Sequence, residues 1–226
     1  MTAEVIESRD QVMRLAAEGR LAGCEIAGIS APGIDLAALD LAGVRIHEVD
    51  LSGVTLDGAR LDGAAFRQVI LRGALLRGIA ASGAAVTDSD LTEIDLSGAD
   101  LARVDIGSSV MPRAQLAGAH ITGTRFVATE LYGARFDGAV ITRSELVGYS
   151  DVPASLGRTS FRGATLVQVD LSGVNLHGAD LRGALVVRSR FCGAQLTEVV
   201  TDGATFIACD FSGADTDGTD LHLGVK

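Results

Sequence analysis

The segment Ala179-Asp180-Leu181-Arg182-Gly183 is one clean copy of a five-residue unit that recurs along nearly the whole chain. Its middle position falls on every number that ends in 1 or 6 from Leu21 to Leu221, and it is Val, Ile, Leu, Met or Phe except at Ala31, Ala81, Asp151, Thr201 and Thr216. All seven phenylalanines of the chain occupy this position, which we call the centre of the repeat. The period of five holds in one register from Gly19 to Leu223, so it decides the fold.

The other positions of the repeat are also restricted. Two residues after the centre, Gly dominates and accounts for 24 of the 28 glycines. Two residues before the centre the side chain is small or β-branched, and Asp recurs immediately before the centre. In an extended segment alternate side chains share a face, so the centre and the small residue are predicted to point inward. Gly then relaxes a turn between short strands, and such small units must stack to bury a core.

This pattern resembles the pentapeptide-repeat family, whose signature is Ala-Asp/Asn-Leu-x-x. The resemblance implies an all-β fold, a right-handed four-sided parallel β-helix with four repeats, or about 20 residues, per coil. About ten coils at a strand spacing of roughly 4.8 Å would give a rod about 50 Å long. We expect a capping helix over residues 1–18, the repeat solenoid over 19–223 and a short tail over 224–226.

Composition excludes several classes of protein. The 226 residues carry a net charge of −10, which argues against a protein that binds nucleic acid through its phosphates. Three cysteines do not suggest a disulfide scaffold. No apolar run is long enough to span a membrane, and the start MTAEVIESRD does not have the pattern of a secretory signal. The cytoplasm is therefore the expected compartment.

The N-terminal segment has its own pattern. Apolar residues recur there at helical spacing: Val5, Ile6, Val12, Met13, Ala16 and Ala17. Thr2 or Ser8 is the expected cap at its start, Ser8 and Gln11 match a capping box, and Gly19 is placed to end the helix. We expect an amphipathic helix that covers the first coil and its unpaired strand edges.

Two further places depart from the regular repeat. The C-terminal coil, with Phe206, Phe211, Leu221 and Leu223, has no comparable cap, so it is a candidate end for packing against a second copy. Residues 147–158 place Asp151 at a centre and Pro153 where Gly is usual. This stretch is either a surface loop or a distorted side. If five or ten residues loop out, the period survives but the downstream sides rotate.

Candidate catalytic and metal-binding chemistry is sparse in the sequence. His47, His120, His177 and His222 all flank centres and fall in different coils, so no zinc site is expected. The run from Asp215 to Asp220 does not have the spacing of a calcium loop. No nucleophile–base pair or phosphate-binding motif stands out, so we expect no cofactor, no metal and no enzymatic activity.

Charge gives the main functional signal. When every fourth centre is assigned to the same side, two adjacent sides each hold 7 acidic and 3 basic residues. The candidate partner-binding residues on this acidic flank are Asp35, Asp50, Asp57, Asp90, Glu93, Asp95, Glu130, Asp137, Asp170 and Asp210. The assignment assumes that no insertion shifts the phase of the coils.

Three functions remain open. The first is a non-catalytic scaffold that presents the acidic flank to a basic protein partner. The second follows from the resemblance: members linked to fluoroquinolone and albicidin resistance imitate DNA and occupy the DNA-binding surface of gyrase. The third is an accessory role in bacterial secretion, because the helix followed by Leu21-Ala22-Gly23 and further repeats resembles pentapeptide-repeat proteins associated with type VI secretion. None of these binds nucleic acid or membrane directly.

Overall fold

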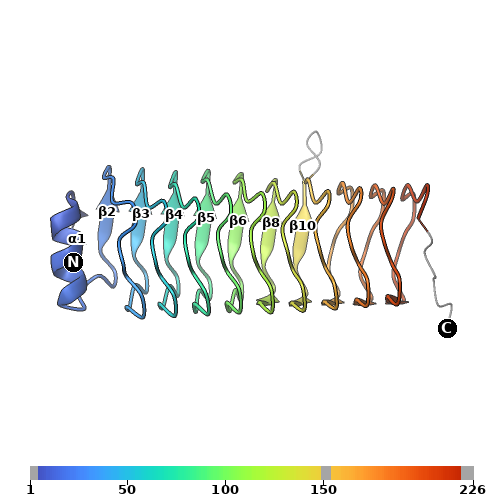
Figure 1. The fold of residues 1–226 in the computed structure, drawn as a ribbon, viewed down its shortest axis with the longest axis horizontal. Helices are drawn as coiled ribbons and strands as arrows, with labels where there is room; N and C mark the ends of the chain where they lie inside the picture. Colours follow the sequence, from blue (N-terminus) through green and yellow to red (C-terminus); the bar gives the residue numbers. More distant parts are fainter. Residues whose placement is uncertain (1–4, 149–153, 220–226) are drawn as a thin grey trace.

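A computed structural model describes residues 5–148 and 154–219, which form a rod of stacked coils with a helix at its N-terminal end (Figure 1). The helix α1 spans Arg9–Ala17. The strands are β1 (Val5–Ile6), β2 (Glu25–Ala27), β3 (Arg45–His47), β4 (Ala65–Arg67), β5 (Ala85–Thr87), β6 (Asp105–Gly107), β7 (His120–Thr122), β8 (Arg125–Val127), β9 (Val140–Thr142), β10 (Glu145–Val147), β11 (Thr165–Val167), β12 (Leu185–Val187) and β13 (Thr205–Ile207).

Two parallel sheets run along different sides of the rod. One contains eight strands in the order β1-β2-β3-β4-β5-β6-β8-β10, and the other contains five in the order β13-β12-β11-β9-β7. Ile26 pairs with Ile46, and Ile46 with Phe66, so one coil takes four repeats. Single bridges link the remaining sides at the same step, for example Asp50 with Ile70 and Thr55 with Leu75. The predicted four-sided parallel β-solenoid is confirmed.

The interior of the rod is built from the two predicted inward positions. Centre residues such as Leu101 and Phe136 are buried, and so are small residues two positions earlier, such as Ala99 and Ala134. Some of these small residues are Ser or Thr, and they remain hydrogen-bonded: the Ser89 hydroxyl donates to a backbone carbonyl and accepts from a backbone amide of the coil before. Among the described residues no buried side-chain polar atom is left without a partner.

The turns between the sides explain both the Gly and the Asp of the repeat. Gly53, two residues after a centre, has φ +64°, a conformation in which a side chain would be strained. Asp50, just before the same centre, accepts a 2.9 Å hydrogen bond from the Ser52 amide and so closes the turn. The recurrent Asp is therefore first of all a turn residue, a role that its outward position in the repeat does not indicate.

The N-terminal segment differs in part from the expected helix. Of the two candidate caps, Ser8 caps α1, because its hydroxyl accepts from the Gln11 amide at 3.3 Å, and Thr2 lies outside the described residues. Val5 and Ile6, however, are not helical: they form β1, which pairs with β2 and so extends the sheet by one strand. The buried face of α1 contains the predicted Val12 and Ala16 together with Leu15, whereas Met13 and Ala17 are exposed.

Among the described residues the regular four-repeat step breaks once. Val140 pairs with Thr165, Arg135 with Ser160 and Glu145 with Asp170, and each of these pairs is five repeats apart. The coil that contains residues 149–153 is therefore longer by one repeat, and those five residues lie outside the described part of the chain. Beyond them the four-repeat step resumes, as in the pairing of Leu166 with Val186.

The extra repeat shifts the side to which each later repeat belongs. We number the sides in chain order. Side 1 runs through Leu21, Leu101, Ile141, Leu166 and Phe206; side 2 through Ile26, Ile106, Leu146, Leu171 and Phe211; side 3 through Ala31, Met111, Leu131, Leu156 and Thr216; side 4 through Leu36, Phe136, Phe161 and Thr201. The uniform phase assumed for the charge assignment is therefore wrong after residue 153.

Candidate functional site

The acidic flank predicted from the sequence is shorter than expected. Eight of its ten residues, from Asp35 to Asp137, lie on the adjacent sides 3 and 4 in the first six coils of the rod. Asp170 and Asp210 lie instead on side 2. Asp170 pairs with Glu145 of the coil before it, Arg190 pairs with Asp170, and Asp210 pairs with Arg190. The extra repeat moves them one side away from the others.

Four of the eight remaining carboxylates are already paired with arginines. Arg72 lies 2.6 Å from Asp90, and Arg113 lies 2.6 Å from Glu93. The other pairs are Arg135 with Asp137, at 2.7 Å, and Arg77 with Asp57, whose Oδ2 also accepts from Arg77 Nε at 3.0 Å. These side chains are partly exposed, so each pair adds little stability. They do cancel half of the charge on the flank.

The other four carboxylates, Asp35, Asp50, Asp95 and Glu130, have no ion pair within the described part of the chain. Asp35 accepts from the Ala37 amide at 3.0 Å, and Asp95 accepts from the amide and hydroxyl of Ser97 at 3.0 and 2.6 Å. These bonds use one carboxylate oxygen and leave the charge facing solvent. We call these four residues the unpaired carboxylates.

Hydrogen bonding keeps the flank ionised. Bonds from the Ser52 hydroxyl and amide hold the pKa of Asp50 below its ordinary value. The Arg77 guanidinium does the same for the pKa of Asp57. Partial burial raises the pKa of Asp137, but the Ser160 hydroxyl and the Arg135 guanidinium outweigh it, so that pKa is also lowered. The flank is therefore anionic at neutral pH.

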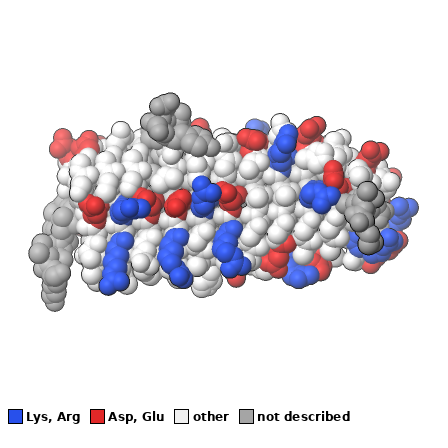
Figure 2. Space-filling view, turned by 180° about the vertical axis from the view of Figure 1, so that it is seen from behind, with Lys and Arg blue, Asp and Glu red and all other residues white. Residues whose placement is uncertain are grey.

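The distribution of charge over the whole rod also changes with the corrected phase. Within the described repeats side 3 holds 7 acidic and 3 basic residues, and side 2 holds 7 and 4. On side 2 the ladder Asp105, Arg125, Glu145, Asp170, Arg190 and Asp210 contains both signs, two arginines among four carboxylates. Figure 2 shows a mixed band of red and blue along the middle of the rod. Side 1 differs from the others, with 5 basic and 3 acidic residues.

The predicted dimer end is only partly described. Phe206 is buried and Phe211 half-buried, and the two rings lie edge to face with centroids 5.6 Å apart. Phe211 also stacks on Phe191 at 4.9 Å. Leu221 and Leu223 lie outside the described residues, as do the tail 224–226 and His222. Self-association through this end stays a prediction.

The candidate metal-binding side chains of the described residues lie apart along the rod. Within residues 5–148 and 154–219 no group of three or more His, Cys, Asp or Glu side chains could hold a metal ion. His47 lies 3.1 Å from Glu25, and His177 lies 3.7 Å from Glu198, on different parts of the rod. The same ranges contain no helix with the length and hydropathy needed to cross a membrane.

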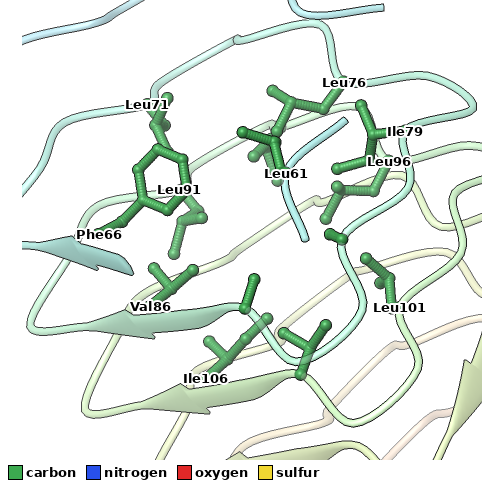
Figure 3. Close-up of a pocket in the computed structure, with 14 residues that line it drawn as sticks. Leu61, Phe66, Leu71, Leu76, Ile79, Val86, Leu91, Leu96, Leu101 and Ile106 are labelled. Carbon is green, nitrogen blue, oxygen red and sulfur yellow. The ribbon is translucent and has the colours of Figure 1, made fainter. Parts of the chain in front are cut away.

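A small cavity lies in the core of the rod. Its volume is about 40 Å³, and side chains such as Leu61, Phe66, Ile79 and Leu101 line it (Figure 3). It arises where Ala81 occupies a centre, with Leu61 and Leu101 in the same ladder on either side. Because its lining is entirely apolar, the cavity is a packing defect with no group that could fix a polar ligand.

Comparison with known proteins identifies the repeats. The family model for pentapeptide repeats matches eight copies, over residues 40–78, 113–147 and 154–186. The interruptions include the stretch in which the extra repeat lies. No curated protein matches the chain in sequence.

Solved structures share the solenoid architecture. QnrB1, a plasmid-mediated fluoroquinolone resistance protein, is 17% identical, with a TM-score of 0.52 over 80% of this chain and 93% of its own. HetL from the cyanobacterium Nostoc sp. strain PCC 7120, a pentapeptide repeat protein involved in the regulation of heterocyst differentiation, is 22% identical over 93% of this chain and 95% of its own, with a TM-score of 0.44. At such identities the likeness shows the fold alone.

Proposed function

We propose that this chain, which belongs to the pentapeptide-repeat family, is a non-catalytic scaffold that binds a basic protein partner through sides 3 and 4 of its first six coils. The observation that carries the proposal is the set of unpaired carboxylates, Asp35, Asp50, Asp95 and Glu130. They project from a rigid frame of backbone ladders, so they need little ordering when a partner binds. Fixed charges of one sign steer an oppositely charged partner and select against like-charged ones.

The charge of these four residues can be removed without loss of the turns, because the chain itself contains an Asn in the same turn position. Asn175 makes the same turn bond as the aspartates, accepting from the His177 amide at 2.9 Å. Asp→Asn substitutions therefore remove the charge and keep the turn. The variant D35N/D50N/D95N/E130Q removes the unpaired charges, and D100N/D202N/D210N/D215N removes four charges elsewhere on the rod.

The experiment is quantitative affinity capture with covalent cross-linking in the source cells, using wild type and both variants. We expect the captured amount of at least one partner with a basic surface to fall tenfold or more with the flank variant and to stay unchanged with the control variant. Equal retention by both variants, or loss from both, would refute the role of this flank.

The flank carries too few charges for a protein that imitates DNA in the binding site of gyrase. From Asp35 to Glu130 the flank spans five coils, or about 24 Å. Duplex DNA carries one charge per about 1.7 Å and would present roughly 14 charges over that length, against four unpaired carboxylates here. A supercoiling assay decides the point. We expect no inhibition or protection of gyrase at micromolar excess, and a dose-dependent effect lost in the flank variant would establish gyrase as the partner.

A further inference from the structure

Side 1 carries a second surface whose chemistry is opposite to that of the flank. Its strands β7, β9, β11, β12 and β13 form a parallel sheet in the C-terminal half of the rod. The outward residues before and after each centre are His120, Thr122, Val140, Thr142, Thr165, Val167, Leu185, Val187, Thr205 and Ile207. None is acidic or permanently basic. On the strands β2 to β6 of side 2, by contrast, the outward positions include Glu25, Arg45 and Asp105.

Half of the outward residues on this sheet face are aliphatic, and three of these are well exposed. Val140 is 36% exposed, Leu185 39% and Ile207 44%, which are among the largest exposures of apolar side chains in the described part of the molecule. The Thr122 and Thr142 hydroxyls bond each other at 3.0 Å, so part of their polarity is satisfied within the ladder. Aliphatic side chains that stand next to one another on an exposed sheet lose contact with water when a partner covers them, which favours binding.

A row of arginines borders this face. Arg103, Arg143 and Arg188 each stand two residues after a centre of side 1, where most repeats have Gly, and their φ angles are 56°, 49° and 50°. Successive members are two coils apart, or about 10 Å. Figure 2 shows basic side chains in a row along the lower edge of the rod, below the mixed band of red and blue.

These arginines can bind carboxylates of a partner, because the nearby carboxylates of side 2 are already paired with other arginines. On side 2, Asp105 and Glu145 lie 3.3 and 3.4 Å from Arg125, and Asp170 lies 2.7 Å from Arg190. Within the described residues Arg143 and Arg188 have no ion pair or hydrogen-bonded side-chain partner. Arg103 donates to the neutral Ser82 hydroxyl at 2.9 Å. In a chain of net charge −10, three cations without carboxylate partners beside an apolar sheet are unexpected.

We propose that this face of side 1 binds an acidic amphipathic segment of a partner protein, with apolar side chains on the sheet and carboxylates on Arg103, Arg143 and Arg188. Charge complementarity selects the acidic partner. Size selects a segment over a second copy of the rod: five strands of three residues cover roughly 24 by 10 Å, far below the about 800 Å² per partner of a stable protein interface. The surface is separate from the unpaired carboxylates, so either proposal can fail alone.

The geometry also fixes the spacing of the partner's charges. An α-helix rises about 1.5 Å per residue, so residues seven apart are about 10.5 Å apart, close to the spacing of the arginines. A helix lying along the rod would then place Glu at every seventh position beside an apolar stripe. Nucleic acid fits the face less well, because the ladder of side 2 next to it has more acidic than basic residues and the outward positions hold no Phe, Tyr or Trp for stacking.

The test uses a labelled 21-residue helical peptide with a Leu stripe bordered by Glu at heptad spacing, and a matched peptide in which Lys replaces each Glu. Fluorescence anisotropy measures binding to the full chain. We expect the Glu peptide to bind at least tenfold more tightly than the Lys peptide. R103E/R143E/R188E should weaken the Glu peptide at least tenfold, and V140S/L185S/I207S at least threefold, with circular dichroism confirming that each variant is folded.

R158E is the matched control, since Arg158 also stands two residues after a centre, at φ 55°, but on side 3. It should leave binding of the Glu peptide unchanged. Equal binding of the two peptides, equal loss in R158E and in the triple arginine variant, or no loss in the triple variant would overturn the proposal. Binding of a 21-base-pair duplex that exceeds binding of the Glu peptide and needs the same arginines would reassign the surface to nucleic acid and also overturn it.

Discussion

Glu145 lies in register with Asp170, five repeats later, whereas Arg125 lies in register with Glu145 only four repeats later. This one difference determines which surfaces the rod presents. It moves Asp170 and Asp210 away from the flank that holds Asp35 to Asp137. It also brings Arg188 onto the side of Arg103 and Arg143, which a uniform four-repeat coil would not do.

A charged side chain at a buried centre should destabilise the rod. Leu101 is 2% exposed, so Leu101→Asp places a carboxylate in an apolar interior and is expected to destabilise its coil by roughly 4 kcal/mol or more. Ala102→Asp introduces the same residue at the neighbouring outward position and should change little. Limited proteolysis with hydrogen exchange over residues 81–121 measures the local effect. Equal protection in both variants would contradict the inward placement of Leu101.

The core cavity should be fillable. Ala81→Val adds two methyl groups beside a cavity of about 40 Å³, and we expect it to stabilise the rod by about 1 kcal/mol. Ala31 is the other alanine at a centre, is fully buried and does not line this cavity. Ala31→Val should therefore overpack the core and destabilise it by roughly 1–3 kcal/mol. Thermal unfolding of the two variants gives the signs, and the same sign for both would argue against a specific void at Ala81.

Because the recurrent aspartate closes a turn, its replacement by Ala should cost more stability than its replacement by Asn. Asp95→Ala removes the acceptor for the Ser97 amide and should cost about 1 kcal/mol. Asp95→Asn keeps an acceptor oxygen, as Asn175 does naturally, and should cost clearly less. Chemical denaturation compares the two. If Asn were as damaging as Ala, the charge of Asp95 and not its turn bond would matter for stability.

The Asp57–Arg77 pair makes stability depend on acid pH. Because the Arg77 guanidinium lowers the pKa of Asp57 in the folded chain, the pair's contribution is present above the unfolded pKa of about 3.9. It is lost as the pH falls through the lower folded pKa. Asp57→Asn should therefore reduce stability at pH 6 and flatten its decline below about pH 4. Melting temperatures between pH 2.5 and 6 test this, and an Asp57→Asn curve parallel to wild type would refute it.

The period of five was sufficient to predict which side chains face inward and that the units stack, whereas the four-sided coil was implied by the resemblance to the pentapeptide-repeat family. Leu101, Phe136 and their equivalents had to face inward whatever the details of the turns. The capping role of Ser8 also followed from local chemistry, since an N-cap hydroxyl acts within its own first turn.

The charged surfaces were harder to predict. An insertion of one whole repeat keeps the period of five intact, so the sequence looks the same whether residues 149–153 join a side or lie outside the ladder. Only the hydrogen bonds between coils show that Ser160 is the residue that pairs with Arg135. The strand at Val5–Ile6 was missed for a related reason: its stability comes from the open edge of β2 and not from its own two residues.

The most direct measurement is a disulfide test of this register. In a background with Cys24, Cys192 and Cys209 replaced by Ala, E145C/D170C places two cysteines on neighbouring strands about 4.8 Å apart, within the range that a disulfide bridges. The comparison variant is E145C/T165C, since a uniform four-repeat coil would pair those two positions instead. We expect complete oxidation of the first pair and free thiols in the second under mild oxidant. The reverse result would contradict the five-repeat coil and, with it, the placement of both proposed surfaces.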